Sequence, residues 1–325
     1  MTTAKLMTRI LSGLALSALV SVGAQAQETT LKLGHLANEA NSWHKASLLF
    51  GEEVSKRTEG RVAVQVYPND SLGREVDLIN GMQLGTVEMT ITGETLQNWA
   101  PMASLLAIPY AYKSLEQMDG VASGEIGKQI EAQILERAQV RPLAYFARGP
   151  RNLTAKREIK TPADLSRMRL RVPNVPLFVD AWTAMGAQPL PMAFSEVFTS
   201  LQNGTLDGQE NPLALIQSAS FNEVQTHVNQ TEHVRSWIYL AISEQAWSQL
   251  SEEDQGHVQE AAKLAQEFER KQFLADEQAI RADLEKKGMT FVEVDQKAFA
   301  DASREAVIKS VDESIRPTVE QLFAQ

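Results

Sequence analysis

The sequence predicts an α/β protein of two lobes with one long helix that spans both. Short apolar strands alternate with amphipathic helices along most of the chain, a pattern typical of lobes built on largely parallel sheets. About 299 of the 325 residues remain once an N-terminal leader is set aside, which is too many for one compact core. Residues 251–287 have helical composition without proline.

Residues 1–26 are predicted to be a signal peptide. Lys5 and Arg9 precede an apolar run at 10–22, and Ala24-Gln25-Ala26 fits a cleavage site before Gln27. The run is well short of the ~20 residues that span a bilayer, which favours a cleaved leader over a short membrane anchor. No lipoprotein cysteine precedes the mature start. We therefore expect a soluble periplasmic protein.

Charge and cysteine content exclude several classes of function. The whole chain carries a formal charge of −10, and removal of two basic leader residues makes it about −12. This balance argues against nucleic acid or anionic lipid as a partner. The chain has no cysteine, so disulfides, thiolate metal sites and thiol catalysis are excluded. No histidine is paired with carboxylates at metal spacing, so we expect no metal and no other cofactor.

The elements fall into two sets along the chain. The first set comprises strands at 31–35, 62–68, 87–92 and 141–147, with helices at 42–58, 75–84 and 125–138. The second set comprises strands at 168–172 and 205–209, with helices at 175–185 and 195–203. Residues 233–243 predict one unusually long strand, long enough to pass between the lobes.

The long helix has a clear beginning and end. Ser251 is a good N-cap, acidic residues follow it in the first turn, and Gly288 ends the pattern. A helix over 251–287 would be about 55 Å long at 1.5 Å per residue, which exceeds one small lobe. The alternative is two helices broken near Gly256 or Lys271.

Two arginines and an asparagine are the first candidates for a binding site. Arg171 lies in the string MRLRVPN, where Pro173 ends the strand, while Arg151 lies in RGPRNLT and Asn211 in GQENP. The planar guanidinium fits a carboxylate with two parallel hydrogen bonds. An arginine at this strand end could therefore hold an organic acid, although a surface arginine would have the same local sequence.

Several longer strings together resemble one protein family. They are LRVPN, MAFSEVF and LQNGTLDGQENP, supported by VYPNDSLGREVDLINGMQLGTVEMT and GPRNLT. Residues 31–310 resemble the DctP-type extracytoplasmic solute-binding proteins of tripartite ATP-independent periplasmic (TRAP) transporters. The resemblance implies a two-lobed periplasmic binding protein with a hinge-closed cleft. It implies no catalytic activity, and delivery of a small organic acid to the small and large subunits of a membrane permease.

The resemblance also implies roles for individual residues. Arg171 matches the arginine that holds the ligand carboxylate, and Asn211 an asparagine that assists it. Arg151 matches a second cationic contact. Asn174 matches a polar contact and Phe194 an aromatic wall. Glu75 and Glu94 match positions that recognise hydroxyl or amino groups. His35 matches a residue that lines the cleft.

Each of these positions has an alternative explanation. Arg151 could form an ion pair with a nearby acid, and Phe194 could belong to the core. Glu75 and Glu94 could be helix-start acids that act only on the helix dipole. His35 stands in a segment, HLANEANSWH, that departs from the sialic-acid members of the family.

The expected lobes are residues 27–148 with 237–276, and residues 149–236 with 277–325. We expect a monomer that binds a sugar acid such as a uronate or aldonate, because Glu75, Glu94 and His35 point to a hydroxylated ligand. The alternatives are a C4-dicarboxylate or 2-oxo acid binding protein of the same system, or an exported carbohydrate-active enzyme. Catalysis would need an activated nucleophile or base, and neither a serine elbow nor an HExxH motif is present.

Overall fold

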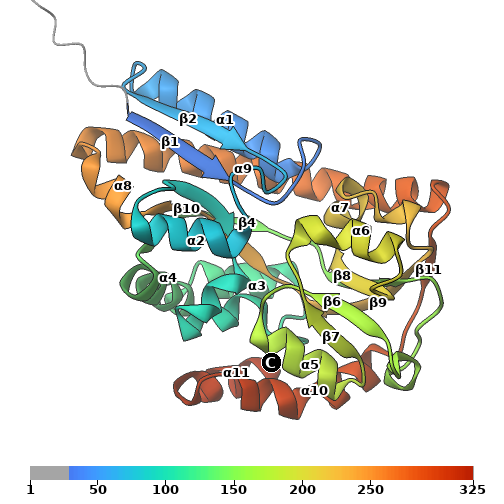
Figure 1. Ribbon diagram of the computed structural model, residues 1–325. Coiled ribbons are helices and arrows are strands. Elements are labelled where there is room, and N and C mark those ends of the chain that lie inside the picture. The colour runs from blue at the N-terminus through green and yellow to red at the C-terminus, as the bar shows by residue number, and fades with distance from the viewer. Residues whose placement is uncertain (1–28, 325) are drawn as a thin grey trace, which may run out of the picture.

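The computed structural model describes residues 29–324, so the predicted leader lies outside the described residues (Figure 1). The first lobe is built on a five-stranded sheet of order β2-β1-β3-β10-β4. Its strands are β1 (Thr29–Gly34), β2 (Val62–Tyr67), β3 (Met89–Thr92), β4 (Val140–Ala147) and β10 (Trp237–Ser243). Its helices are α1 (Ser42–Arg57), α2 (Glu75–Leu84), α3 (Leu115–Ala122), α4 (Glu125–Ala138) and α8 (Glu244–Gln249).

The second lobe is built on a six-stranded sheet of order β11-β9-β5-β8-β6-β7. Its strands are β5 (Arg151–Ala155), β6 (Arg169–Val172), β7 (Gln188–Pro191), β8 (Gly208–Pro212), β9 (His227–Val234) and β11 (Thr290–Val292). The helices near it are α5 (Pro176–Ala184), α6 (Val197–Gln202), α7 (Leu213–Ser218), α10 (Gln296–Ser310) and α11 (Arg316–Ala324). The predicted strand at 205–209 thus begins three residues later, and GQENP is the strand itself.

Both sheets are largely parallel, as expected, and each contains one strand that runs against the others, β10 in the first sheet and β5 in the second. In the first sheet β1 pairs in parallel with β2 and β3, whereas β10 is antiparallel to β3 and β4. In the second sheet β5 is antiparallel to both β8 and β9. The antiparallel strands are those that enter from the other lobe. A parallel neighbour needs a long crossover connection within its own sheet, which these short links do not provide.

The single strand predicted at 233–243 is two strands in different sheets. β9 ends at Val234, β10 begins at Trp237, and only Arg235 and Ser236 separate them. Every residue of β10 is buried, and so is the end of β9. Arg235 and Ser236 are the polar interruption in this segment, and they coincide with the change of sheet. The expectation that this segment passes between the lobes is met by the two-residue link.

Residues 252–286 form one helix, α9 (Glu252–Lys286), rather than two. The side chain of Ser251 accepts a hydrogen bond from the Asp254 amide, as a good N-cap should. Gly288, with φ of 94°, follows the last turn. Val258 and Ala262 pack in the core of the first lobe, whereas Leu284 packs in that of the second. The helix therefore spans both lobes (Figure 1).

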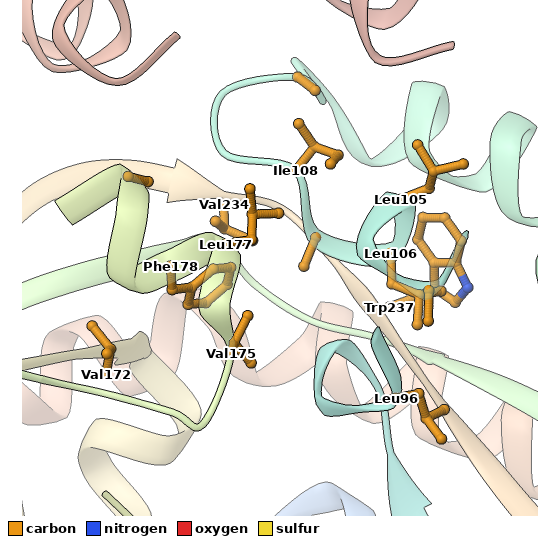
Figure 2. Close-up of a cluster of buried hydrophobic side chains, with 14 of the residues drawn as sticks. Leu96, Leu105, Leu106, Ile108, Val172, Val175, Leu177, Phe178, Val234 and Trp237 are labelled. Atoms are coloured by element: carbon orange, nitrogen blue, oxygen red, sulfur yellow. The ribbon is translucent and has the colours of Figure 1, made fainter. Parts of the chain in front are cut away.

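A buried apolar cluster joins the lobes where the chain crosses between them (Figure 2). The first lobe contributes Leu106, Ile108 and Trp237, and the second contributes Phe178 and Val234. These side chains are almost fully inaccessible to water. Their burial therefore stabilises the connection between the two lobes. No helix within residues 29–324 is both long and apolar enough to cross a membrane.

Candidate functional site

A cavity of about 440 Å³ lies between the two lobes. This is within the range of roughly 300–1,000 Å³ typical of small-molecule sites. Seven of the eight predicted site residues line it, two from the first lobe and five from the second: Glu75 and Glu94, and Arg151, Arg171, Asn174, Phe194 and Asn211. His35 is not among the lining residues.

Arg171 is a buried cation that contacts no carboxylate within residues 29–324. It lies on β6 and is 4% exposed. Its Nε and Nη2 both donate to the backbone oxygen of Met192, at 2.9 and 2.7 Å. The guanidinium carbon lies 5.8 Å from the centre of the Phe194 ring. Burial lowers the pKa of Arg171 to about 10, so the side chain stays charged at neutral pH.

Arg151 is ion-paired, which is the alternative that the sequence left open. Its Nε and Nη2 donate to the two carboxylate oxygens of Glu210 at 2.5 and 2.7 Å, and its Nη1 donates to Glu94 at 3.1 Å. Glu210 also lies 2.8 Å from Nε2 of His233. Although burial favours the neutral acid, Arg151 and then His233 hold the pKa of Glu210 at about 2.

Glu210 was not among the residues predicted from the sequence, because its burial is visible only in the folded chain. It occupies a strand in which every residue is buried, and a glutamate in that position needs a cationic partner. β5 and β8 pair so that Arg151 stands opposite Pro212, next but one to Glu210 on that strand. The antiparallel register therefore brings the two charges together.

Glu94 and Arg148 form a second buried pair in the cavity wall. Nη1 of Arg148 donates to both carboxylate oxygens of Glu94 at 2.8 Å. The guanidinium of Arg148 also lies 5.4 Å from the ring centre of Trp43. Burial opposes ionisation of Glu94, but Arg148 and Arg151 outweigh it and hold its pKa below the ordinary value. Glu94 is thus fully engaged by protein cations.

Glu75 and Asp70 are cavity carboxyl groups that contact no cation within residues 29–324. Glu75 begins α2 and accepts a hydrogen bond from Oγ1 of Thr92 at 2.6 Å. Burial and the charge of Glu94 raise the pKa of Glu75. Oδ1 of Asp70 is buried with no hydrogen-bond partner in the same range. Burial also raises the pKa of Asp70, although Ser195 and Arg171 oppose the shift.

The remaining lining residues of the second lobe complete the wall opposite these carboxyl groups. Nδ2 of Asn211, on β8, donates to Gln209 at 2.7 Å. The side chain of Asn174 is exposed, and its backbone oxygen accepts a bond from Asn98 of the first lobe at 2.9 Å. Phe194 stacks edge-on against Phe221 with ring centres 5.8 Å apart, so it contacts both the core and the cavity.

His35 is a structural residue of the first lobe. It is 1% exposed, and its Nε2 lies 3.3 Å from Nδ1 of His44. Burial and then His44 lower the pKa of His35 to about 3, so the ring is neutral. The sequence placed it correctly near the end of β1, but the side chain turns into the protein.

An ion pair crosses the mouth of the cavity. Arg74, just before α2, pairs with Glu196 at the start of α6. Both residues line the cavity and were not singled out from the sequence. Because the two residues belong to different lobes, this contact joins the lobes across the cavity. Within residues 29–324 no cluster of three or more histidine and acidic side chains could hold a metal ion.

Comparison with known proteins agrees with this geometry. A family model described as DctP, bacterial extracellular solute-binding protein, family 7, matches residues 33–316. A solute-binding protein of Roseobacter denitrificans is 69% identical over 309 residues, covering 95% of each chain. The 2,3-diketo-L-gulonate-binding periplasmic protein of Escherichia coli is 32% identical over 295 residues, covering 90% of this chain and 88% of that protein.

Solved structures are similar over nearly their whole length. A TRAP periplasmic solute-binding protein from Roseobacter denitrificans, with bound L-galactonate, superposes with a TM-score of 0.90 at 70% identity. The match covers 91% of this chain and 99% of that one. A Haemophilus influenzae protein with bound L-gulonate gives a TM-score of 0.86 at 32% identity, with the same coverage.

These matches extend from the first strand to the C-terminal helices, and they include the cavity and the long helix. The matched proteins are periplasmic binding components of transporters and not enzymes, as the sequence led us to expect. The exported enzyme is therefore set aside. The chain belongs to the DctP family, the bacterial extracellular solute-binding proteins of family 7.

Proposed function

We propose that this chain binds a sugar acid in the periplasm, an aldonate such as L-galactonate, and delivers it to a membrane permease. The observation that carries the proposal is Arg171, a buried cation that lines the same cavity as Glu75 and Asp70, two carboxyl groups that contact no cation within residues 29–324. Related structures support the ligand class, since proteins at 70% and 32% identity hold L-galactonate, L-gulonate and D-erythronate.

The ligand carboxylate is assigned to Arg171. Two of its five N–H groups are used by the Met192 oxygen, which leaves the others for an acid. Asn211 and Asn174 line the same part of the cavity and can add amide donors without adding charge. Phe194 covers the guanidinium from one side. Together these groups would offset the cost of removing a carboxylate from water.

The ligand hydroxyls are assigned to Glu75 and Asp70. Both keep acceptor capacity that the protein does not use. Glu94 and Arg151 also line the cavity, but their charges are already paired within the protein, so they stabilise its wall. His35 is left without a ligand role.

This assignment disfavours the C4-dicarboxylate and the 2-oxo acid. Succinate and pyruvate have no hydroxyl group that can donate a hydrogen bond. With either ligand bound, the side chains of Glu75 and Asp70 would therefore stay unpaired in the closed cavity. Each unpaired buried acceptor costs about 1–3 kcal/mol. A polyhydroxylated acid satisfies them.

The test is a thermal-shift and calorimetric series on the purified mature protein. The ligands are L-galactonate, L-gulonate, D-galacturonate, D-erythronate, succinate and pyruvate. We expect L-galactonate to bind most tightly, with about 2.7 kcal/mol of stabilisation at a hundredfold excess over Kd. A larger shift with succinate or pyruvate than with any sugar acid would overturn the proposed ligand class.

Export, transport and organisation are part of the same proposal. The leader at 1–26 would be cleaved so that the periplasmic protein begins at Gln27, which mass spectrometry of the exported protein can check. The partners would be the small and large permease subunits, and the protein would act as a monomer. The proposed lobes remain 27–148 with 237–276 and 149–236 with 277–325, consistent with which sheet each strand joins.

A further inference from the structure

We propose that the cavity admits a sugar acid with one negative charge and rejects the diacid of the same carbon skeleton. The inference rests on the proposed function and narrows it to monoacids. It follows from how the charged side chains around the cavity are paired with one another.

The cationic side chains are nearly all neutralised by the protein. Four arginines line the cavity. Arg148 is held by Glu94, Arg151 by Glu210 and Glu94, and Arg74 by Glu196. Arg171 alone among them contacts no carboxylate within residues 29–324. One positive charge is therefore left for a ligand.

The buried pairs cannot easily be rearranged to supply a second cation. Arg151 is 1% exposed and Glu210 is fully buried. Turning Arg151 toward a ligand would leave the carboxylate of Glu210 in the interior without its bidentate partner, which is strongly unfavourable. Arg148 is fixed in the same way by Glu94 and also packs over Trp43.

The free carboxyl groups would disfavour a second ligand carboxylate. Glu75 and Asp70 lack a cationic partner in the described part of the chain, and the exposed Asp77 also borders the cavity. A hydroxymethyl end donates a hydrogen bond to such a group, whereas a carboxylate end only accepts. Replacing the first by the second removes the donor from this contact and places a second negative charge beside Glu75, Asp70 and Asp77, where the arginines already paired with Glu94, Glu210 and Glu196 are not free to neutralise it.

L-Galactonate and galactarate make a matched pair of probes. They share all six carbons and four hydroxyl groups, and differ only in whether the terminal carbon is a primary alcohol or a carboxylate. Isothermal titration of the mature protein at pH 7.5 should give galactarate an affinity at least about 100-fold lower than that of L-galactonate, two tenfold steps in Kd.

Glu75→Gln tests the cause of the discrimination. Replacing this carboxyl group with an amide, which can donate a hydrogen bond to a ligand carboxylate, should narrow the ratio of the two dissociation constants by about tenfold, equal to one such step. Glu125→Gln is the matched control, because Glu125 also occupies the first turn of a helix, α4, but is exposed and does not line the cavity. For Glu125→Gln the ratio of the two dissociation constants should equal that of the wild type. Asp70→Asn serves as a second test variant if Glu75→Gln does not fold.

The outcomes separate the two proposals. Galactarate binding within tenfold of L-galactonate would overturn the single-charge inference and leave the sugar-acid function standing. A ratio unchanged in both Glu75→Gln and Asp70→Asn would also overturn it, because the source of the discrimination would then lie elsewhere. Failure of every sugar acid to bind, together with tight binding of succinate, would overturn the proposed function and this inference with it.

Discussion

Arg171 is buried and contacts no acidic side chain within residues 29–324. A bound ligand anion would supply the partner that its charge lacks. Arg171→Ala should lower the affinity for L-galactonate by a few hundredfold to several thousandfold, about 3–5 kcal/mol, because the ligand carboxylate would be buried without its cation. The fold should survive, since the lost bonds go to a single backbone oxygen. Titration calorimetry and a ligand-free melt measure the two effects.

Arg169→Ala is the matched control for this variant. Arg169 lies two residues earlier on β6, and its side chain is 43% exposed and paired with Asp207. Its removal should leave Kd unchanged. Arg171→Lys should also bind poorly, because the planar fork of donors is lost. A loss of less than tenfold for Arg171→Ala would show that the carboxylate is held elsewhere.

Arg151, unlike Arg171, is paired with buried acids of the protein. Arg151→Met leaves Glu210 and Glu94 buried without this cation, so the free energy of unfolding should fall by about 3–5 kcal/mol. The double variant Arg151→Met/Glu210→Gln should recover a large part of that loss, because no unpaired charge remains on β8. Urea denaturation of the three proteins measures the difference. Equal stability of the two variants would contradict the pairing of these side chains.

At the scale of the element, α9 contains a buried acid in its middle turns. Glu269 is fully buried, and its Oε1 accepts a bond from Oγ of Ser42 at 3.1 Å. Burial raises the pKa of Glu269 to about 8, against the opposing bonds from Ser42 and the backbone of Ala147. The helix therefore has a neutral carboxyl group against the first lobe at pH 7.

This raised pKa makes stability depend on pH in a definite direction. Between the unfolded value of about 4.3 and the folded value of about 8, the native state holds a proton that the unfolded chain has lost. The contribution of Glu269 to the free energy of unfolding therefore falls as pH rises through that range. Glu269→Gln cannot ionise, so its stability relative to the wild type should increase from pH 5 to pH 8.5.

Urea denaturation at several pH values between 5 and 8.5 checks the slope. Glu267→Gln, an exposed position two residues earlier on α9, should run parallel to the wild type. A Glu269→Gln variant whose stability stays at a constant offset from the wild type would contradict a neutral Glu269.

At the scale of the whole molecule, contacts across the cleft define a closed arrangement. Arg74 pairs with Glu196, Nδ2 of Asn98 donates to the backbone oxygen of Asn174, and a third bond joins the lobes at Asn38. The proposed ligand would bridge the same two walls. Saturating L-galactonate should therefore favour closure. Small-angle scattering should give a smaller radius of gyration with ligand, and an unchanged radius would argue for a cleft that does not move.

The ion pair across the mouth offers a finer test of the same motion. Arg74→Glu should weaken binding roughly 1.5- to 5-fold through faster dissociation, the effect expected of an exposed pair worth about 0.2–1 kcal/mol. Glu196→Arg in the same protein should restore the wild-type rate, because the pair is re-formed with opposite polarity. Stopped-flow kinetics measures both, and a double variant no better than Arg74→Glu would contradict a pair that acts across the cleft.

Features with local causes could be predicted from the amino-acid sequence. Ser251 and Gly288 marked the ends of α9 because caps act within a few residues of themselves. The alternation of short strands with helices indicated two α/β lobes for the same reason. The arginine at the end of β6 could be proposed as the anion site, since its charge and its proximity to Pro173 are visible in the string itself.

The pairing of charges and the change of sheet depend on contacts between distant segments, which became visible in the folded chain. Arg151 could equally have been a ligand contact until the register of β5 against β8 placed Glu210 beside it. The polar pair Arg235 and Ser236 interrupts the segment at 233–243, but the sequence does not say that the strands on either side of it join different sheets. Both depend on pairing between segments far apart in the chain, and the energy of a buried charge is set by its neighbours in space. That pairing leaves Arg171 as the lining arginine, within residues 29–324, that contacts no carboxylate.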